Sequence, residues 1–380
     1  MENSLFRTYQ FGKKNPAIRR ADIFAFSTTS MMVDFIISLI PLIIFNFIRS
    51  GLLPFLDYKI TWMQMLKPLI FPVVGGLFSF LVEALWLSFR FKTDWQAKLK
   101  TSYGMIPGLL LGMVLPGATP LWVFFFGILF GMIFGKLLFG GFGQNIVNPA
   151  LLGYLFINLA FYGVITNSSA SLQSVEAIAG TTPLTYFKAM KDGQAFDPLS
   201  YSGGIHNLFF GLHPGSGAET PVFLIIISGL YLSARGIINW RTPVSILVTA
   251  FILTTLASLF LKSKFNFNTV LFQMFSGGLF FGSVFMATDP VTSPRTPEGK
   301  IIFGVLIGIV TVILRLLSSM PEGMMVAILM MNLMVFLIDD NVSRMRVATK
   351  KWRRMDFYFY TAFVVLFLIG FLFLKLGVSK

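Results

Sequence analysis

The amino-acid sequence predicts an all-α polytopic membrane protein, and composition is the first of three observations behind this prediction. Hydrophobic residues make up 55% of the 380 residues and charged residues only 12%, about half the charged share of a soluble domain. Such a chain has too little polar surface to cover a soluble core. The absence of cysteine excludes a disulfide-stapled fold, and it excludes thiolate-bound iron–sulfur clusters and cysteine zinc sites within this chain.

The second observation is a series of apolar stretches, each of which can cross or enter a membrane as a helix. A full crossing takes about 20 residues. The region from Thr101 to Val175 carries a single charge, Lys136, and glycines and prolines divide it into shorter passages. Ten or eleven passages are expected, some of them short or broken. The predicted spans are 31–48, 68–89, 105–115 continuing to 121–138, 148–165, 220–238, 242–261, 268–288, 301–317, 323–338 and 356–376.

The third observation is an internal repeat. The segment 108–120 (GLLLGMVLPGATP) aligns without gaps on 278–290 (GLFFGSVFMATDP), with five of the thirteen positions identical. A similar span follows each copy, FGILFG at 126–131 and FGVLIG at 303–308. An odd number of predicted spans separates the copies, which indicates an inverted-topology repeat whose broken helices form a site near the membrane midplane. The alternative is that GxxxG spacing recurs by chance and serves only close helix packing.

The distribution of charge predicts the orientation. The net charge of +14 comes from the N-terminal segment and from 90–100, 235–241 and 339–354, which all fall on one side if the spans alternate. Loops rich in lysine and arginine stay in the cytoplasm, so this charge is better explained by topology than by nucleic-acid binding, which is not expected. The N-terminus is therefore expected inside, and the loop 166–219 and the C-terminus outside. The polar first thirty residues predict no cleavable signal peptide.

Polar residues gather at two predicted helix breaks. In 140–150 (GGFGQNIVNPA) these are Gln144, Asn145 and Asn148, and amides at membrane depth must line a cavity or bond one another. They fit the wall of a cofactor or cation site, or a helix break held together by side-chain hydrogen bonds. In 285–294 the corresponding residues are Thr288 and Asp289, which fit a cation or cofactor site or the cap of the next helix.

Three carboxylates are candidates for an ion pathway, because ionisable groups inside a bilayer are commonly functional. They are Asp34, Glu83 and Asp289. Asp34 and Glu83 fit equally the neutralisation of a nearby lysine or arginine. The sequence shows no catalytic triad, no metal-ligand spacing, no Rossmann fingerprint and no P-loop, so neither a catalytic residue nor a metal site nor direct NADH binding is predicted.

Three segments together resemble one membrane family. They are GKLLFGGFGQNIVNPALLGY (135–154), FFGSVFMATDPVTSP (280–294) and GSGAETP (215–221). The family contains the D subunit of the Rnf ion-translocating electron-transport complex and the B subunit of the sodium-translocating NADH:quinone reductase, and the resemblance covers roughly residues 15 to 340. It implies two inverted repeats of about five helices with broken half-helices, a fold similar to that of urea channels. The last predicted span lies beyond the family pattern and is expected to be an extra C-terminal helix.

The resemblance also implies a covalent cofactor. Members of the family carry FMN joined through its phosphate to a threonine in a motif resembling Asp-x-x-Ser-Gly-Ala-Thr. The matching stretch here, 176–182, reads EAIAGTT and makes Thr182 the expected attachment point, preceded by Gly180 and Thr181. Glu176, Ala179 and Thr181 depart from the motif, and Thr181 is an alternative attachment point. Some members hold a second, non-covalent riboflavin, for which the two polar breaks would be suitable walls.

The function implied by the resemblance is that of a flavin-carrying subunit of a redox-driven ion pump, which is not catalytic alone. Electrons would pass through FMN, coupled to translocation of Na⁺ or H⁺. The expected partners are a second flavin-bearing subunit and membrane iron–sulfur subunits, in a bacterial inner membrane. The alternatives are a small-solute channel or transporter without redox chemistry, and a passive anchor.

The expected segments are 1–30 (cytoplasmic), 31–165 (first transmembrane repeat), 166–219 (external flavin-bearing loop), 220–338 (second transmembrane repeat), 339–355 (basic cytoplasmic loop) and 356–380 (C-terminal transmembrane helix).

Overall fold

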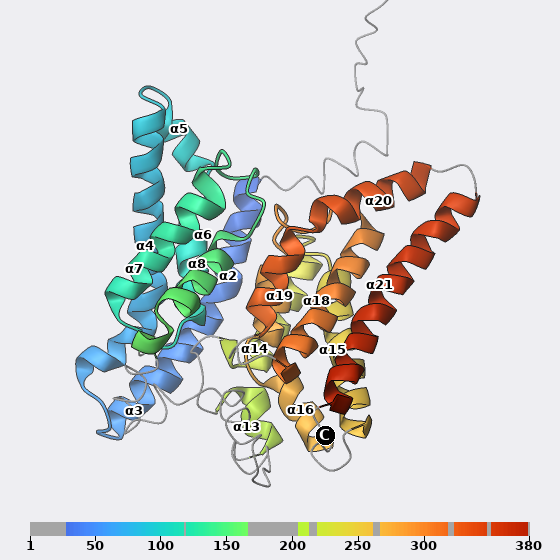
Figure 1. Cartoon of the computed structure of the whole chain (residues 1–380). Coiled ribbons are helices and arrows are strands. Elements are labelled where there is room, and N and C mark those ends of the chain that lie inside the picture. The colour runs from blue at the N-terminus through green and yellow to red at the C-terminus, as the bar shows by residue number, and fades with distance from the viewer. Residues whose placement is uncertain are drawn as a thin grey trace, which may run out of the picture.

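A computed structural model describes residues 28–117, 119–165, 204–212, 219–260, 267–317, 323–347 and 351–378. Across these ranges every regular element is a helix and no strand occurs (Figure 1). Among the described residues, four helices are long and apolar enough to cross a membrane, or up to six if each of two bent pairs counts as one span. The protein is therefore an all-α polytopic membrane protein, as the composition predicts.

The first half contains five main helices and several short turns. Its helices are α2 (Thr28–Phe47), α3 (Leu53–Leu56), α4 (Trp62–Arg90), α5 (Trp95–Lys100), α6 (Met105–Val114), α7 (Leu121–Met132) and α8 (Pro149–Ala160). Five-residue π-helical turns follow α2 (η1, Ile48–Leu52) and α7 (η2, Ile133–Leu137). Helix α4 begins before the predicted residue 68, because Gln64 Oε1 accepts a hydrogen bond from Thr61 N at 3.0 Å and so satisfies a free amide at the helix start.

The second half repeats this plan and adds helices at its end. Its elements are α13 (Ile205–Phe210), α14 (Val222–Ala234), α15 (Arg241–Phe260), α16 (Phe267–Phe275), α17 (Leu279–Phe281), η5 (Gly282–Met286), α18 (Pro297–Leu317), α19 (Gly323–Asn332), α20 (Val335–Val347) and α21 (Lys351–Val378). The predicted span 268–288 is broken, with a bend of 54° between α16 and α17. Gly277 lies at this bend with φ +65°, a conformation that glycine adopts without strain.

The segment 339–355, predicted as a loop, is helical over much of its length. Helix α20 leaves α19 at a bend of 54° and continues through the basic residues to Val347. Asp340 and Arg344 form an ion pair of 2.8 Å one turn apart, which favours a helix over a loop. Figure 1 shows α20 lying across one end of the second half, with α21 running back along the bundle.

The first helices of the two halves, α2 and α14, run antiparallel. At one end Arg235 Nη2 lies 2.7 Å from Asp34 Oδ2, near the start of α2 and just after the end of α14. At the other end Arg49 Nη1 donates to Thr220 Oγ1 at 2.6 Å, beyond the end of α2 and just before α14. The second half therefore begins at the end of the bundle where the first helix finishes, as an inverted repeat requires.

The two aligned copies of the sequence repeat share their local course. In the first, α6 ends at Val114, irregular backbone passes through Pro120, and the longer helix α7 follows. In the second, the π-helical turn η5 ends at Met286, irregular backbone passes through Pro290, and α18 follows. Each half thus contains a short helix that stops inside the bundle and leaves polar backbone there.

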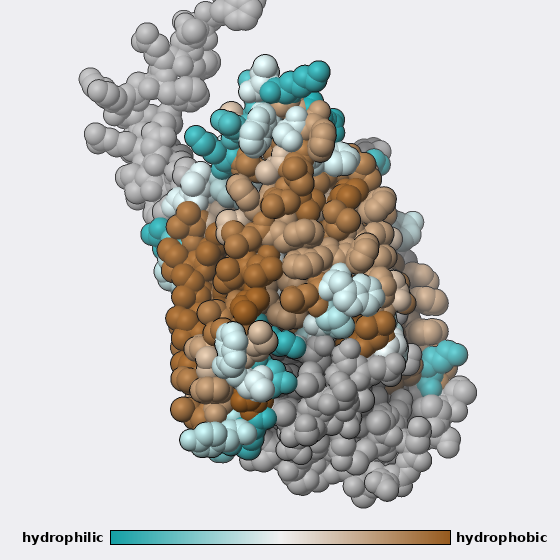
Figure 2. Space-filling model, turned by 90° about the vertical axis from the view of Figure 1, so that its left-hand side faces the viewer, coloured by the Kyte–Doolittle hydropathy of each residue, from teal (hydrophilic) through white to brown (hydrophobic). Residues whose placement is uncertain are grey.

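The apolar and polar surfaces are arranged as a membrane protein requires. Figure 2 shows a broad hydrophobic surface over the first half, with hydrophilic residues toward its upper and lower ends. The basic helices α5 and α20 lie at the same end of the bundle in Figure 1. Arg235 joins them there through its contact with the start of α2. The described basic segments therefore lie on one side, as the alternation of spans predicts.

Candidate functional site

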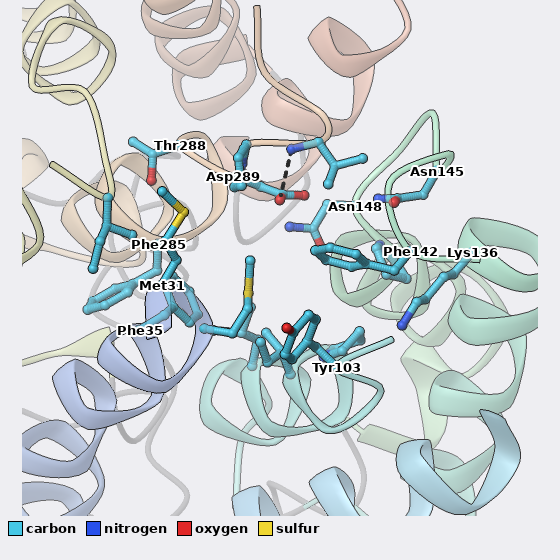
Figure 3. Close-up of a pocket in the computed structure, with 18 of the residues that line it drawn as sticks. Met31, Phe35, Tyr103, Lys136, Phe142, Asn145, Asn148, Phe285, Thr288 and Asp289 are labelled. Atoms are coloured by element: carbon cyan, nitrogen blue, oxygen red, sulfur yellow. Dashed lines mark hydrogen bonds between the residues drawn. The ribbon is translucent and has the colours of Figure 1, made fainter. Parts of the chain in front are cut away.

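A pocket lies between the two halves, at the end of the bundle that carries the basic segments (Figure 3). It encloses a volume of about 80 Å³ and is partly open. Both predicted polar breaks contribute to its wall, together with the start of α2 and the entry to α6. The lining residues are Met31, Met32, Phe35, Tyr103, Ile106, Pro107, Leu110, Lys136, Phe142, Asn145, Asn148, Pro149, Ile237, Ile238, Phe285, Thr288, Asp289, Pro290 and Val291.

The break in the first half is held together by its own amides. Asn148 is the N-cap of α8, where its Oδ1 accepts a hydrogen bond from Ala150 N at 3.0 Å. Asn145 Nδ2 donates to Val147 O at 3.4 Å. Pro149 occupies the first turn of α8, where its missing N–H costs nothing. The same amides that stabilise the break also line the pocket, so the two interpretations of this motif are compatible.

The break in the second half has a matching construction around Asp289. Its carboxylate accepts hydrogen bonds from Val291 N at 3.3 Å and from Thr292 Oγ1 at 3.0 Å. The neighbouring Thr288 hydroxyl donates to the Val284 carbonyl. In Figure 3 the Asp289 and Asn148 side chains project into the same space from the two halves. Two motifs far apart in the sequence are thereby brought to one site.

Asn332, which sequence reasoning missed, connects the two breaks. In the orientation that satisfies both ends of its amide, Oδ1 accepts from Asn148 N at 3.2 Å and Nδ2 donates to Thr292 O at 3.1 Å. The residue is buried at the end of α19. Its signal in the sequence is a single amide inside the apolar stretch 323–338.

Glu83 lies behind the pocket wall in a buried ion pair with Lys136. Lys136 Nζ is 2.9 Å from Glu83 Oε1 and 3.0 Å from Oε2, and it also donates to Ser102 O at 2.6 Å. The Ser102 hydroxyl donates to the same carboxylate. Glu83 is 0% exposed and Lys136 2% exposed. Of these three residues Lys136 lines the pocket, and its sequence signal is that it carries the single charge between Thr101 and Val175.

Asp34 is also paired, with Arg235. It accepts hydrogen bonds from Arg235 Nε at 3.1 Å and from the Tyr231 hydroxyl at 3.0 Å. This contact raises the pKa of Arg235 above its ordinary value, because the hydrogen bond to Asp34 favours the charged guanidinium. Asp34 thus joins α2 to the end of α14, and its neighbour Phe35 lines the pocket.

Gln144, another predicted site residue, does not line the pocket. Gln144 is exposed, and its side-chain oxygen lies against Gly140. Gly140 has φ +117°, a conformation that L-amino acids other than glycine rarely adopt. Gly180, Thr181 and Thr182 lie outside the described residues.

Buried polar residues also occur toward the opposite end of the bundle. Arg49, Glu219 and Thr220 are all buried there. A Cβ atom placed on Gly278 would lie 2.6 Å from Glu219 Oε2, so this carboxylate packs against the start of the second repeat copy. Glu219 belongs to the GSGAETP segment, and its burial was not predicted.

The chain is similar to a known family over most of its length. Residues 14–348 match the model of the NQR2, RnfD, RnfE family. The B subunit of the Na⁺-translocating NADH-quinone reductase of Chromohalobacter salexigens is 36% identical over 240 residues, which cover 62% of this chain and 56% of that relative. The D subunit of the ion-translocating oxidoreductase complex of Alcanivorax borkumensis is 30% identical over 75% of this chain and 85% of its own length. The D subunit of the proton-translocating ferredoxin:NAD⁺ oxidoreductase complex of Clostridium ljungdahlii is 35% identical over 65% and 74%, respectively.

Proposed function

The chain belongs to the NQR2, RnfD, RnfE family, and we propose on this basis that it is the flavin-carrying membrane subunit of an ion-translocating electron-transport complex. The observation that carries the proposal is the pocket between the two halves, where Asn148 and Asp289 from the two breaks meet. The relatives of this chain are named as subunits of redox complexes that move ions. A site shared by two inverted halves is suited to coupling, because both halves can respond to one bound group.

The chemistry of the pocket wall suits a flavin ring. Asn145 and Asn148 provide amide groups for the polar edge of such a ring, while Tyr103, Phe142 and Phe285 provide flat aromatic surfaces. One water molecule needs about 10–15 Å³ of such space, so the enclosed 80 Å³ accommodates part of a ring and the open side accommodates the rest. When bound, a flavin would supply the electron carrier. The residues of this chain would orient it and exclude water.

Besides the flavin in the pocket, a covalent flavin is proposed on Thr182, as FMN in phosphoester linkage. The support is the resemblance of 176–182 to the flavinylation motif of the family. Thr181 is the alternative attachment point, because a threonine hydroxyl stands at both positions. The loop that carries them would lie outside the membrane, opposite the cytoplasmic basic segments.

The proposed ion path passes Asp289. Of the three predicted carboxylates it is the one that lines the pocket, and it is held there by Val291 and Thr292. A cation at Glu83 or Asp34 would first have to displace Lys136 or Arg235. The relatives are named for Na⁺ and for protons, and the proposal accordingly covers either ion.

The chain would work only within a complex. It carries no nicotinamide motif and no cysteine, so partner subunits with a second flavin and iron–sulfur clusters would deliver the electrons and accept them. The proposed location is a bacterial inner membrane, with the N-terminus in the cytoplasm and 166–219 outside.

In-gel flavin fluorescence of the denatured chain tests the covalent cofactor. The wild-type chain is expected to fluoresce, Thr182→Ala to be dark, and Thr181→Ala to retain the signal. A dark wild-type band, with no FMN adduct on the intact mass, contradicts the covalent assignment. Absence of both covalent and extractable flavin would favour the small-solute channel.

Ion transport by the reconstituted complex tests the role of Asp289. Asp289→Asn removes the charge with little change in shape and is expected to lower transport at least tenfold, because a cation in the pocket loses its counter-charge. Asp57→Asn is the matched control, since Asp57 is an exposed carboxylate with 61% of its side chain accessible. Unchanged transport by an intact Asp289→Asn complex contradicts the proposed path and supports the passive anchor.

A further inference from the structure

Lys136 places a buried positive charge in the wall of the pocket. It lies on the π-helical turn η2, whose extra residue alters which side chains face inward, and such turns are frequent at functional sites. Its Nζ is 5.8 Å from the centroid of the Phe142 ring, another lining residue. Figure 3 shows Lys136 at the edge of the pocket beside Phe142.

The surroundings of Lys136 fix the position of its ammonium group. Glu83 contacts the ammonium through both carboxylate oxygens, and the Ser102 carbonyl accepts a third hydrogen bond. Glu83 does not itself line the pocket. The ion pair therefore presents its positive end to the pocket and keeps its negative end behind the wall.

We propose that the pocket binds the reduced, negatively charged form of its flavin ring more tightly than the oxidised form, and that Lys136, held by Glu83 and Ser102, supplies this preference. The inference rests on the proposed function, because it requires a flavin in this pocket. It assigns Glu83 to positioning Lys136 rather than to ligating the transported cation.

The physical reason is the change of charge on reduction. A ring that takes up two electrons and one proton gains one negative charge, and the electrons would come from a flavin or iron–sulfur group of a partner subunit. In this proposal Lys136 acts through its charge and exchanges no proton with the ring. The attraction between unit charges at contact distance is several-fold larger in a protein interior than in water, so a single ammonium in the wall changes the relative affinity of the two forms.

Asp289 acts with the opposite sign. Its carboxylate lines the same pocket and repels a negatively charged ring, and it also interacts electrostatically with Lys136. A cation that arrives at Asp289 cancels this repulsion. Lys136 and Asp289 together thus link reduction of the ring to uptake of a cation, and substitutions at the two positions must shift the reduction potential in opposite directions.

The test uses the full chain in lipid nanodiscs, with riboflavin as the probe. Thr181→Ala and Thr182→Ala are included in this parent chain so that no covalent flavin contributes to the spectrum. The test variant combines Lys136→Met with Glu83→Gln, which removes the ion pair without leaving a buried charge. Lys136→Arg retains the charge, and Lys59→Met removes an exposed lysine as the matched control.

The measurements are the spectroelectrochemical reduction potential of bound riboflavin and its Kd in the oxidised and dithionite-reduced states. The double variant is expected to lose at least tenfold of the preference for the reduced form, which equals a fall of about 30 mV for a two-electron couple. Asp289→Asn is expected to raise the potential, while Lys136→Arg and Lys59→Met stay near the parent value.

Two results overturn the inference in distinguishable ways. If the double variant binds riboflavin with the parent potential, the role of Lys136 is wrong while the flavin pocket stands. If the folded parent chain binds no riboflavin in either state, the assignment of the pocket in the proposed function is wrong, and the inference falls with it.

Discussion

Each half of the protein buries a cationic side chain near the end of a long helix, α7 in the first half and α18 in the second. In the first half this is Lys136, just after α7, which donates to the backbone carbonyl of Ser102 at 2.6 Å. In the second half it is Arg315, near the end of α18, which donates to the backbone carbonyls of Gln273 and Ser276. In both halves the cation donates hydrogen bonds to backbone carbonyls at or near a helix end, before α6 in the first half and at the end of α16 in the second, where water would be scarce.

The halves differ in what surrounds the cation. Lys136 has the Glu83 carboxylate behind it and a pocket of about 80 Å³ in front. Arg315 lines a cavity of about 10 Å³, which has room for roughly one water molecule. Both halves thus bury a cation against backbone carbonyls, and in the described part of the chain the larger pocket lies beside Lys136.

The largest expected effect comes from removing one partner of the buried ion pair between Glu83 and Lys136. Lys136→Met leaves Glu83 buried without its counter-charge and is expected to cost about 3–5 kcal/mol of stability, seen as a lower unfolding temperature and folded yield in detergent. Adding Glu83→Gln should restore most of the loss. Lys59→Met, at an exposed ion pair, should change stability by only about 0–1 kcal/mol. A single variant as stable as the wild type would refute the energetic part of the comparison.

An intermediate effect is expected in the second half. Arg315→Met removes the donors to the Gln273 and Ser276 carbonyls and should cost about 1–3 kcal/mol in all. Riboflavin binding should be unchanged, since Arg315 does not line the large pocket. If Arg315→Met abolishes flavin binding in protein that elutes as a folded monodisperse species, the assignment of flavin binding to the pocket beside Lys136 alone is wrong.

The smallest expected effect is a difference in stability between substitutions at Gly112 and Gly282, two glycines that are aligned in the sequence repeat. A Cβ atom on Gly112 would lie 2.6 Å from the backbone oxygen of Phe71, which cannot easily yield. A Cβ atom on Gly282 would lie 2.8 Å from Met324 Cγ, part of a flexible side chain. Gly112→Ala is therefore expected to destabilise the protein by about 1–3 kcal/mol and Gly282→Ala by less. Thermal unfolding of the two variants in parallel decides this, and equal losses would contradict the packing difference.

The sequence predicted most of the helices because a helix in a membrane requires a continuous run of apolar residues, which is visible locally in the chain. The predicted 105–115 is observed as Met105–Val114, and the predicted break in 285–294 is observed as irregular backbone between η5 and α18. The bend at Gly277, inside the predicted span 268–288, was not predicted. Asn145, Asn148, Thr288 and Asp289 were predicted from amides and a carboxylate in apolar surroundings, and all four line one pocket. Polar groups at membrane depth are costly, so they stand out in the sequence without any knowledge of their neighbours.

The contacts between distant residues could not be predicted, for a different reason. Lys136 and Glu83 were both visible as isolated charges, but they are 53 residues apart and their pairing depends on how α4 packs beside α7. Asn332 joins the two breaks only because α19 lies against α8. The exposed position of Gln144 depends on the course of the glycine-rich turn, which composition does not specify.

The sequence by itself thus determined the membrane class, most of the helices, the inverted repeat and the polar residues at its breaks, because these follow from local hydrophobicity and from chain order. Only the tertiary structure decided which of those polar groups face a common space. It paired Glu83 with Lys136 and Asp34 with Arg235, and it left Asp289 in the pocket wall. The physical reason is that a buried charge is stabilised by whichever group lies within a few ångströms, and packing of distant helices sets that distance.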